Sequence, residues 1–214
     1  MSFDALAAHY RWMERVLAGN KLQRCRTAYL AQVAASQNVL LLGEGNGRFL
    51  VECRRALPAA RLTCLDASGP MLALARRRLR RLDPTTAGVE FVHADVLEWT
   101  PPAPAFDLIV THFFLDCFRP EQLERIVASI ASAASARAVW LLADFAVPSR
   151  GLARCRAQII HRMMYAFFRA ATRLPARALT PPDDFLRSNH FVLRDRARSE
   201  WGLLHSDRWE RGGR

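Results

Sequence analysis

Short runs of aliphatic and β-branched residues alternate along the first two thirds of the chain with segments whose apolar residues recur every three or four positions. The runs have the length of buried strands, and the intervals between them admit crossover helices. This pattern is typical of a doubly wound α/β fold, in which a mostly parallel sheet carries helices on both faces. The five predicted strands cover residues 39–43, 62–66, 89–94, 106–111 and 138–144.

Capping residues and prolines mark where the helices between these strands begin and end. Pro58 ends one helix, while Ser68 is the expected N-cap of the next, which has Pro70 near its first turn. Pro120 opens another helix in the same way. The predicted helices cover residues 4–17, 22–33, 48–57, 71–82 and 120–135.

The rhythm changes after the fifth predicted strand. Apolar residues at helical spacing predict one long amphipathic helix over 152–171, which we expect to cover the sheet. Two later runs, over 191–198 and 201–209, predict a closing hairpin with a tight turn at Ser199-Glu200. The apolar face of the long helix is expected to contain Leu152, Ile159, Ile160, Met163, Met164, Phe167, Phe168 and Ala171.

Composition fits a folded globular domain, since 51% of the 214 residues are hydrophobic and 24% are charged. The five cysteines form no CxxC pair, so they predict neither a disulfide framework nor a zinc ribbon, and no metal site is expected. We read them as reduced thiols, which favours a cytoplasmic location. No apolar run approaches the roughly 18 residues of a membrane span, and the N-terminus lacks a signal-peptide pattern.

The formal net charge of +11 is large enough to suggest a nucleic-acid or anionic-membrane partner. However, Lys21 is the only lysine among the 31 basic residues, and this arginine bias with abundant alanine indicates a GC-rich genome. The arginines are spread along every segment rather than gathered with aromatic stacking partners. We therefore predict no specific nucleic-acid site and leave peripheral contact with an anionic membrane open.

A glycine-rich loop, Gly43-Glu44-Gly45-Asn46-Gly47, follows the first predicted strand and opens a helix. In that context closely spaced glycines let the backbone approach a bound nucleotide. Asp66 ends the next strand, 23 residues after Gly43, where its carboxylate can accept hydrogen bonds from both ribose hydroxyls. A dinucleotide loop would place its third glycine one residue later, and Glu44 would repel a pyrophosphate. The loop suits a cofactor with an amino-acid tail and a sulfonium.

Three successive segments resemble motifs of class I S-adenosylmethionine-dependent methyltransferases: residues 44–48, residues 66–72 and His93-Ala94-Asp95-Val96. The resemblance covers roughly residues 37–145. It implies that S-adenosylmethionine is the cofactor and S-adenosylhomocysteine the product. It also implies a seven-stranded sheet whose last strand is antiparallel. The segment after the fifth strand is similar to that of ubiquinone- and menaquinone-biosynthesis methyltransferases.

In that family the first loop carries the methionine part, the acid after strand two binds ribose, and the acid after strand three binds the adenine amino group. Apolar residues form the walls of the adenine site, although ordinary core packing is nearly as good an explanation here. The residues that the resemblance assigns to the cofactor are Gly43, Glu44, Gly45, Gly47, Asp66, Ala67, Met71, Asp95, Val96 and Thr111.

The segment after strand four, Thr111 to Asp116, is expected to face the methyl group. It contains neither the Asn/Asp-Pro-Pro-Tyr motif nor the Pro-Cys nucleophile of nucleic-acid base methyltransferases. His112 is a candidate general base because its ordinary pKa lies near neutrality. Asp116 is the second catalytic candidate, either orienting His112 or holding the acceptor. A packed His112 and a helix-capping Asp116 remain open alternatives.

Bulky residues suggest a cover for an apolar acceptor. Tyr10 and Trp12 of the first helix, with residues of the 152–171 helix, are lid candidates, although ordinary helix packing explains them as well. A small apolar or aromatic acceptor, methylated on oxygen or carbon, is the leading hypothesis. An RNA or protein methyltransferase and a noncatalytic cofactor-binding module remain alternatives, and the sequence does not predict an oligomeric state.

We expect one methyltransferase domain over residues 1–214. Its parts are N-terminal helices over 1–36, a cofactor-binding core over 37–147, a helical substrate-side segment over 148–190 and a closing hairpin over 191–210.

Overall fold

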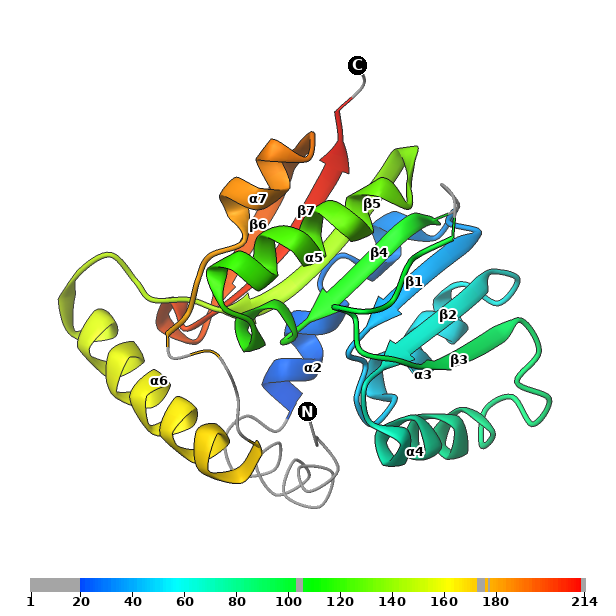
Figure 1. The fold of residues 1–214 in the computed structure, drawn as a ribbon, viewed down its shortest axis with the longest axis horizontal. Helices are drawn as coiled ribbons and strands as arrows, with labels where there is room; N and C mark the ends of the chain where they lie inside the picture. Colours follow the sequence, from blue (N-terminus) through cyan, green and yellow to red (C-terminus); the bar gives the residue numbers. More distant parts are fainter. Residues whose placement is uncertain (1–19, 103–105, 173–175, 177, 213–214) are drawn as a thin grey trace.

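The computed structural model describes residues 20–102, 106–172, 176 and 178–212, without the side chains of 167–172. Within these ranges seven strands form one sheet with the order β3-β2-β1-β4-β5-β7-β6 (Figure 1). The predicted helix over 4–17, with Tyr10 and Trp12, lies outside the described residues. The strands are β1 Asn38–Leu42, β2 Arg61–Asp66, β3 Val89–His93, β4 Phe106–His112, β5 Ala134–Phe145, β6 Phe191–Ser199 and β7 Leu204–Arg211.

The strand directions confirm the predicted sheet. The β1 strand pairs in parallel with both β2 and β4, and β5 pairs in parallel with β4. The final strand, β7, is inserted between β5 and β6 and runs antiparallel to both. All five predicted parallel strands are present, and β5 begins four residues earlier than the prediction. Because the strand order reverses between β1 and β4, the carboxyl ends of these two strands form the usual ligand-binding edge of such a sheet.

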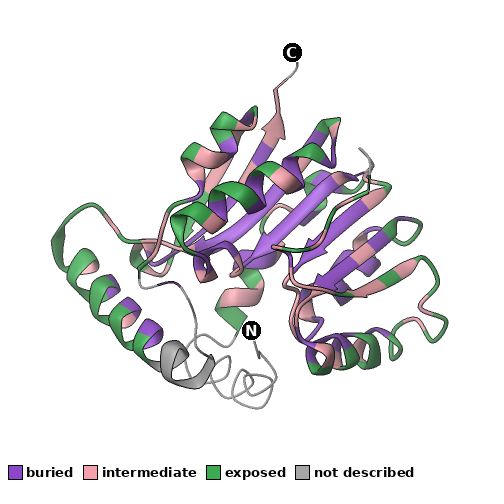
Figure 2. Ribbon diagram, viewed as in Figure 1, coloured by how far each residue is buried: buried purple, intermediate pink, exposed green. Residues whose placement is uncertain are grey.

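Helices cover the two faces of the sheet and bury two apolar cores (Figures 1 and 2). Alternate side chains of β1 lie on opposite faces of the sheet. Leu40 and Leu42 pack on the α5 side, whereas Val39 and Leu41 pack on the α3 side. This alternation follows from the two-residue period of a strand. The helices that cover the faces are α5 Pro120–Ser132 and α7 Asp183–Ser188 on one side, and α3 Arg48–Ala56, α4 Gly69–Leu79 and the short η2 Leu30–Val33 on the other.

Besides shifts of a few residues at the ends of elements, three features differ from the sequence prediction. The helix expected over 22–33 is divided into α2 Asn20–Thr27 and η2. The α7 helix was not predicted, because its six residues are too few to show a period. The last hairpin closes through η4 Glu200–Gly202 rather than a two-residue turn, and Glu200 and Trp201 adopt left-handed φ values of 54° and 60°.

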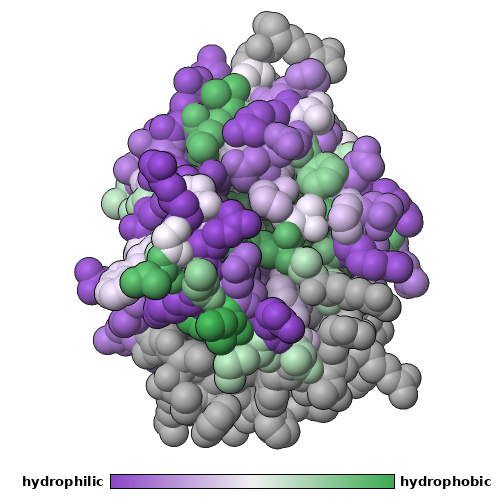
Figure 3. Space-filling model, turned by 90° about the vertical axis from the view of Figure 1, so that its left-hand side faces the viewer, coloured by the Kyte–Doolittle hydropathy of each residue, from purple (hydrophilic) through white to green (hydrophobic). Residues whose placement is uncertain are grey.

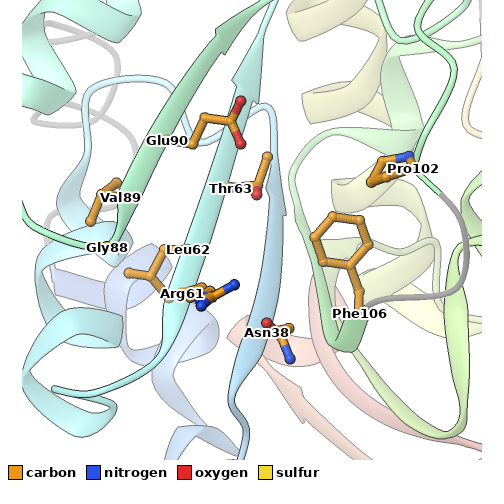
Figure 4. A pocket seen from close by; sticks show the side chains of 9 residues that line it. All are labelled: Asn38, Arg61, Leu62, Thr63, Gly88, Val89, Glu90, Pro102 and Phe106. Carbon is orange, nitrogen blue, oxygen red and sulfur yellow. The ribbon is translucent and has the colours of Figure 1, made fainter.

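No helix is present in residues 94–102, on the path from β3 to β4, although the spacing admits one. Pro101 and Pro102 lack the N–H that a helix interior requires. The face of the sheet beside this connection holds a hollow of about 570 Å³ (Figure 4). It opens at the amino ends of the strands, away from the glycine loop. Its lining residues are Asn38, Arg61, Leu62, Thr63, Gly88, Val89, Glu90, Pro102 and Phe106.

The long helix, α6 Gly151–Thr172, lies beside the sheet instead of covering a face (Figure 1). Its buried residues contact Cys117, Phe145 and Leu179, close to the carboxyl ends of β4 and β5. The predicted apolar face is therefore wrong in part, because packing against the strand ends buries a different side of the helix. The buried residues are Ala157, His161, Met164 and Tyr165, whereas Leu152, Ile159 and Met163 are exposed. Within the described ranges, no helix is both long and apolar enough to cross a bilayer.

Candidate functional site

The glycine loop connects β1 to α3 at the carboxyl edge of the sheet, where all three of its glycines have left-handed φ values of 62° to 78°. Residues with a Cβ atom rarely adopt this conformation. A Cβ atom added at Gly47 would lie 2.6 Å from the Cα atom of Ala75 in α4, whereas nothing lies within 4 Å of one added at Gly45. Gly47 therefore lets two helices approach, and Gly45 faces open space.

Asp66, at the end of β2, is fixed against this loop. Its Oδ2 atom accepts a hydrogen bond of 3.1 Å from the Gly45 N–H, and its Oδ1 atom accepts one of 2.9 Å from the Ser68 N–H. The residue is only half-buried. A carboxylate oxygen has more than one lone pair, so Asp66 can also accept hydrogen bonds from a ligand above Gly45.

The sequence assigned Glu44 to the cofactor site, but in the structure its carboxylate caps a helix. Its Oε1 atom accepts hydrogen bonds from the N–H groups of Phe49 and Leu50, at 2.8 and 2.9 Å, and thereby caps α3. Burial raises the pKa of Glu44 to about 7, while these two hydrogen bonds and the charge of Arg26 act in the opposite direction. The geometry favours a capping role for this carboxylate over contact with a cofactor.

The residues expected around an adenine ring lie just after β2 and β3, with Met71 in α4. Asp95 is half-buried, and its Oδ1 atom accepts a hydrogen bond of 3.0 Å from the Leu97 N–H. Met71 and Val96 are both buried, and Val96 belongs to the core on the α5 side. The Ala67 carbonyl oxygen lies 3.1 Å from the His93 ring nitrogen Nε2. Asp66 and Asp95 thus offer polar groups at one edge of the sheet, and their role toward adenine stays a prediction.

At the end of β4, Thr111 and His112 point into the protein. The Thr111 hydroxyl accepts a hydrogen bond of 2.8 Å from the Trp140 indole N–H and is 1% exposed, which favours a structural role. The buried His112 ring packs edge-on against Phe49, with 4.5 Å between ring centroids, and its Nδ1 atom has no hydrogen-bond partner. Burial, together with the nearby charge of Arg26, holds the pKa of His112 well below its usual value.

Asp116 does not orient His112, because no hydrogen bond joins these two residues. Asp116 lies in η3 Leu115–Cys117, where its Oδ1 atom lies 3.6 Å from the Cys117 thiol. Its neighbour is Asp144 of β5, whose carboxylate accepts a hydrogen bond from the Asp116 N–H. Burial raises the pKa of both carboxyl groups, and for Asp144 the charge of Asp116 raises it further. Tyr165 of α6 closes this cluster by donating a 3.1 Å hydrogen bond to the Asp116 carbonyl oxygen.

Sequence reasoning missed Asp144, Tyr165 and Phe114 as site residues. The signal for Asp144 was its position at the end of predicted strand five, because the carboxyl ends of adjacent parallel strands meet at one edge. Phe114 lies within the Thr111–Asp116 segment that was expected to face the methyl group, but it was not singled out there; its ring lies against the glycine loop. A Cβ atom added at Gly43 would lie 2.2 Å from the Phe114 Cδ2 atom. The Phe114 ring thus lies beside the loop, and Asp116 follows it two residues later in the chain.

In comparison with known proteins, residues 39–136 match a family described as a methyltransferase domain. A curated relative, the demethylmenaquinone methyltransferase of Thermus thermophilus, is 33% identical over 115 residues. These residues are 52% of this chain and 50% of the relative. The match thus spans about half the length of that protein.

Solved structures of low sequence identity share this fold. TnmH superposes with a TM-score of 0.70 at 18% identity, covering 98% of this chain and 60% of TnmH. The 1,6-didemethyltoxoflavin-N1-methyltransferase of Burkholderia thailandensis was crystallised with 1,6-didemethyltoxoflavin and S-adenosylhomocysteine. Its TM-score is 0.68 at 18% identity, with 99% of this chain and 88% of that protein covered. At such identities the likeness shows the fold alone.

Proposed function

We propose that the chain is an S-adenosylmethionine-dependent enzyme that methylates a small apolar or aromatic acceptor on a hydroxyl oxygen or a carbon atom. The match of residues 39–136 to a methyltransferase domain supports this proposal. The whole chain would act as one domain. The observation that carries the proposal is the contact of the Phe114 ring with Gly43, which puts an aromatic wall beside the cofactor loop. A buried carboxyl group, that of Asp116, follows two residues later.

The residues present fit the cofactor. The open space at Gly45 leaves room above the loop, and Asp66 is held beside it by the Gly45 N–H. In this proposal the loop holds the methionine part, Asp66 the ribose and Asp95 the adenine amino group, with Met71 and Val96 as apolar neighbours. When bound, S-adenosylmethionine supplies a methyl group that its sulfonium has already activated.

We assign proton transfer to Asp116 rather than His112. A hydroxyl acceptor must lose its proton as the methyl group is transferred, so a nearby base accelerates the reaction. Burial raises the pKa of the Asp116 carboxyl above its usual range, which makes its ionised form a stronger base. Burial and the charge of Asp116 also raise the pKa of the neighbouring Asp144 carboxyl. Phe114 excludes water from the same space.

The test is turnover of S-adenosylmethionine against a panel of phenols and quinols, with wild type, Asp116→Asn and Glu124→Gln. Glu124 is exposed on α5, so its variant controls for the loss of one negative charge. We expect Asp116→Asn to lower turnover by about a hundredfold or more and to leave cofactor affinity unchanged. The turnover rate of wild type should rise with pH, with a midpoint above the ordinary Asp pKa of about 3.9. Asp116→Asn should not show this rise.

Two results would contradict the proposal. Retained turnover in Asp116→Asn with a hydroxyl acceptor would remove Asp116 from proton transfer. If the protein methylates RNA or protein but no small molecule, the proposed class of acceptor is wrong. If it binds the cofactor without any turnover, it is a noncatalytic module.

A further inference from the structure

The side of α6 that faces away from the protein is apolar. Leu152, Ile159 and Met163 are 85%, 59% and 69% exposed. They are seven and four positions apart, so on a helix with about 100° per residue they form one stripe. The buried residues His161 and Tyr165 lie on the opposite side. The α6 helix thus has two apolar faces, and only one of them has a partner among the described residues.

The tip of the last hairpin extends this stripe. Trp201 in η4 is 77% exposed and has a φ of 60°, a conformation that is strained for a bulky residue. The Arg156 guanidinium of α6 lies 5.7 Å from the centroid of the Trp201 ring and donates a 3.1 Å hydrogen bond to the Glu200 carbonyl oxygen. We call Leu152, Ile159, Met163 and Trp201 the α6 surface.

Positive charge surrounds the α6 surface. The 38 residues from 145 to 182 contain seven arginines and no Asp or Glu. Arg150, Arg154, Arg156 and Arg162 are exposed in this segment. Figure 3 shows the side of the molecule that carries α6, where hydrophobic side chains lie among hydrophilic ones. A helix with a basic polar surface and exposed apolar side chains is typical of proteins that bind the interface of anionic membranes.

We infer that the α6 surface docks the protein on an anionic phospholipid bilayer. The apolar side chains of Leu152, Ile159 and Met163 enter the boundary between headgroups and acyl chains, and the arginines contact the phosphate groups. Tryptophan is enriched at this depth of membranes, because its ring is apolar and its N–H is polar. The opposite face of α6 contacts Asp116 through Tyr165, so docking would place the proposed acceptor region close to the bilayer.

A second copy of the chain fits this surface less well. A two-fold symmetric dimer would bring the same arginines against their copies, with no acidic residue of the 145–182 segment to pair with them. Four apolar side chains are also far fewer than the roughly 20–30 residues that each partner contributes to a stable interface. A membrane supplies the opposite charge and requires no matching shape.

The test measures sedimentation of the full chain with vesicles, without any cofactor or acceptor. One vesicle set is phosphatidylcholine alone, and the other also contains phosphatidylglycerol. We expect at least about tenfold tighter binding to the anionic set, with a loss at high salt, because each basic residue near the surface contributes to binding. The triple variant Leu152→Ser, Ile159→Ser, Met163→Ser should lose about tenfold or more of this affinity.

The control variant Leu82→Ser, Val192→Ser removes exposed apolar side chains from outside α6 and should bind as wild type does. Thermal melts establish that all variants are folded. Trp201 gives an independent readout, since vesicles should shift the fluorescence of wild type to the blue and leave Trp201→Phe unchanged. Equal binding to both vesicle sets, or undiminished binding by the triple variant, would overturn the inference. So would a wild-type dimer in solution that the triple variant dissociates.

Discussion

Two glycines of the cofactor loop have the same backbone conformation but different surroundings, which makes them a matched pair for mutation. Gly45 and Gly47 have φ values of 64° and 78°. A Cβ atom at Gly45 would enter open space, whereas one at Gly47 would lie 2.6 Å from the Ala75 Cα atom, a backbone atom that cannot move alone. Gly45→Ala therefore tests the space for the cofactor, and Gly47→Ala tests the packing of the loop on α4.

The magnitudes follow from two contributions to stability. Placing alanine in the left-handed region costs about 1–2 kcal/mol at either position, partly offset by the lower entropy of the unfolded chain. At Gly47 the overlap with Ala75 adds roughly 1–3 kcal/mol. For a protein of this size 1 kcal/mol corresponds to about 2–4 °C, so Gly47→Ala should lower the Tm by several degrees more than Gly45→Ala does.

Cofactor affinity should show the reverse order. Gly45→Ala places a methyl group in the open space that we assign to the cofactor and should weaken binding of S-adenosylhomocysteine at least tenfold. Gly47→Ala should affect binding less, measured by calorimetry below its Tm. If Gly45→Ala binds as wild type does, the cofactor does not approach Gly45. If the two variants have equal Tm values, the loop does not pack on α4 as described.

Three further predictions concern ionisable residues. Asp66→Ala should weaken S-adenosylhomocysteine binding by roughly 1.5–3 kcal/mol in calorimetry, the scale of hydrogen bonds to a charged group, and a change of a few tenths would make Asp66 a surface acid. Glu44 is half-buried as a residue, but its carboxyl group is enclosed, and the pKa of this group is raised to about 7. The protonated carboxyl group therefore contributes its full stabilisation below about pH 4.5, and this contribution is lost as the pH rises through 7. Between pH 5 and 8 the Tm of Glu44→Gln should therefore rise relative to that of wild type, and its relative gain in the free energy of unfolding should be at most roughly 3 kcal/mol. Parallel curves of Tm against pH for the two proteins would contradict the raised pKa. His112→Ala should lower the Tm, because the His112 ring packs on Phe49, but turnover should still rise with pH as it does in wild type. If this rise is lost while the Tm is unchanged, His112 is the base.

Local patterns in the sequence were sufficient for the strands, the glycine loop and several helix ends. The predicted N-cap is confirmed, because the Ser68 hydroxyl accepts a hydrogen bond from the Met71 N–H. Such features depend on residues within a few positions of each other. The predicted turn at Ser199-Glu200 was wrong because Glu200 and Trp201 take left-handed conformations that neither residue type favours.

Features that depend on distant contacts were beyond a single sequence. The exposed side of α6 looked like a core face, because periodicity shows that a helix is amphipathic but does not show what covers it. The hydrogen bond from Tyr165 to Asp116 spans 49 residues and decides which side is buried. The contact between Phe114 and Gly43 likewise needs β4 to lie beside β1, which the sheet order provides.

Aspartate residues at the carboxyl edge of this sheet are either half-buried or buried. Aspartates lie at or beyond the ends of four of the five strands in the run β3-β2-β1-β4-β5: Asp66, Asp95, Asp116 and Asp144. The first two are half-buried and accept backbone N–H donors, and a carboxylate oxygen can accept more than one hydrogen bond. The last two are buried, and burial raises the pKa of both carboxyl groups, because ionising two neighbouring buried carboxyl groups is costly. The difference in burial therefore fits the two proposed roles, with Asp66 and Asp95 accepting hydrogen bonds from a cofactor and Asp116 taking part in proton transfer. Enzymes that keep two carboxyl groups at different pKa values use the same principle.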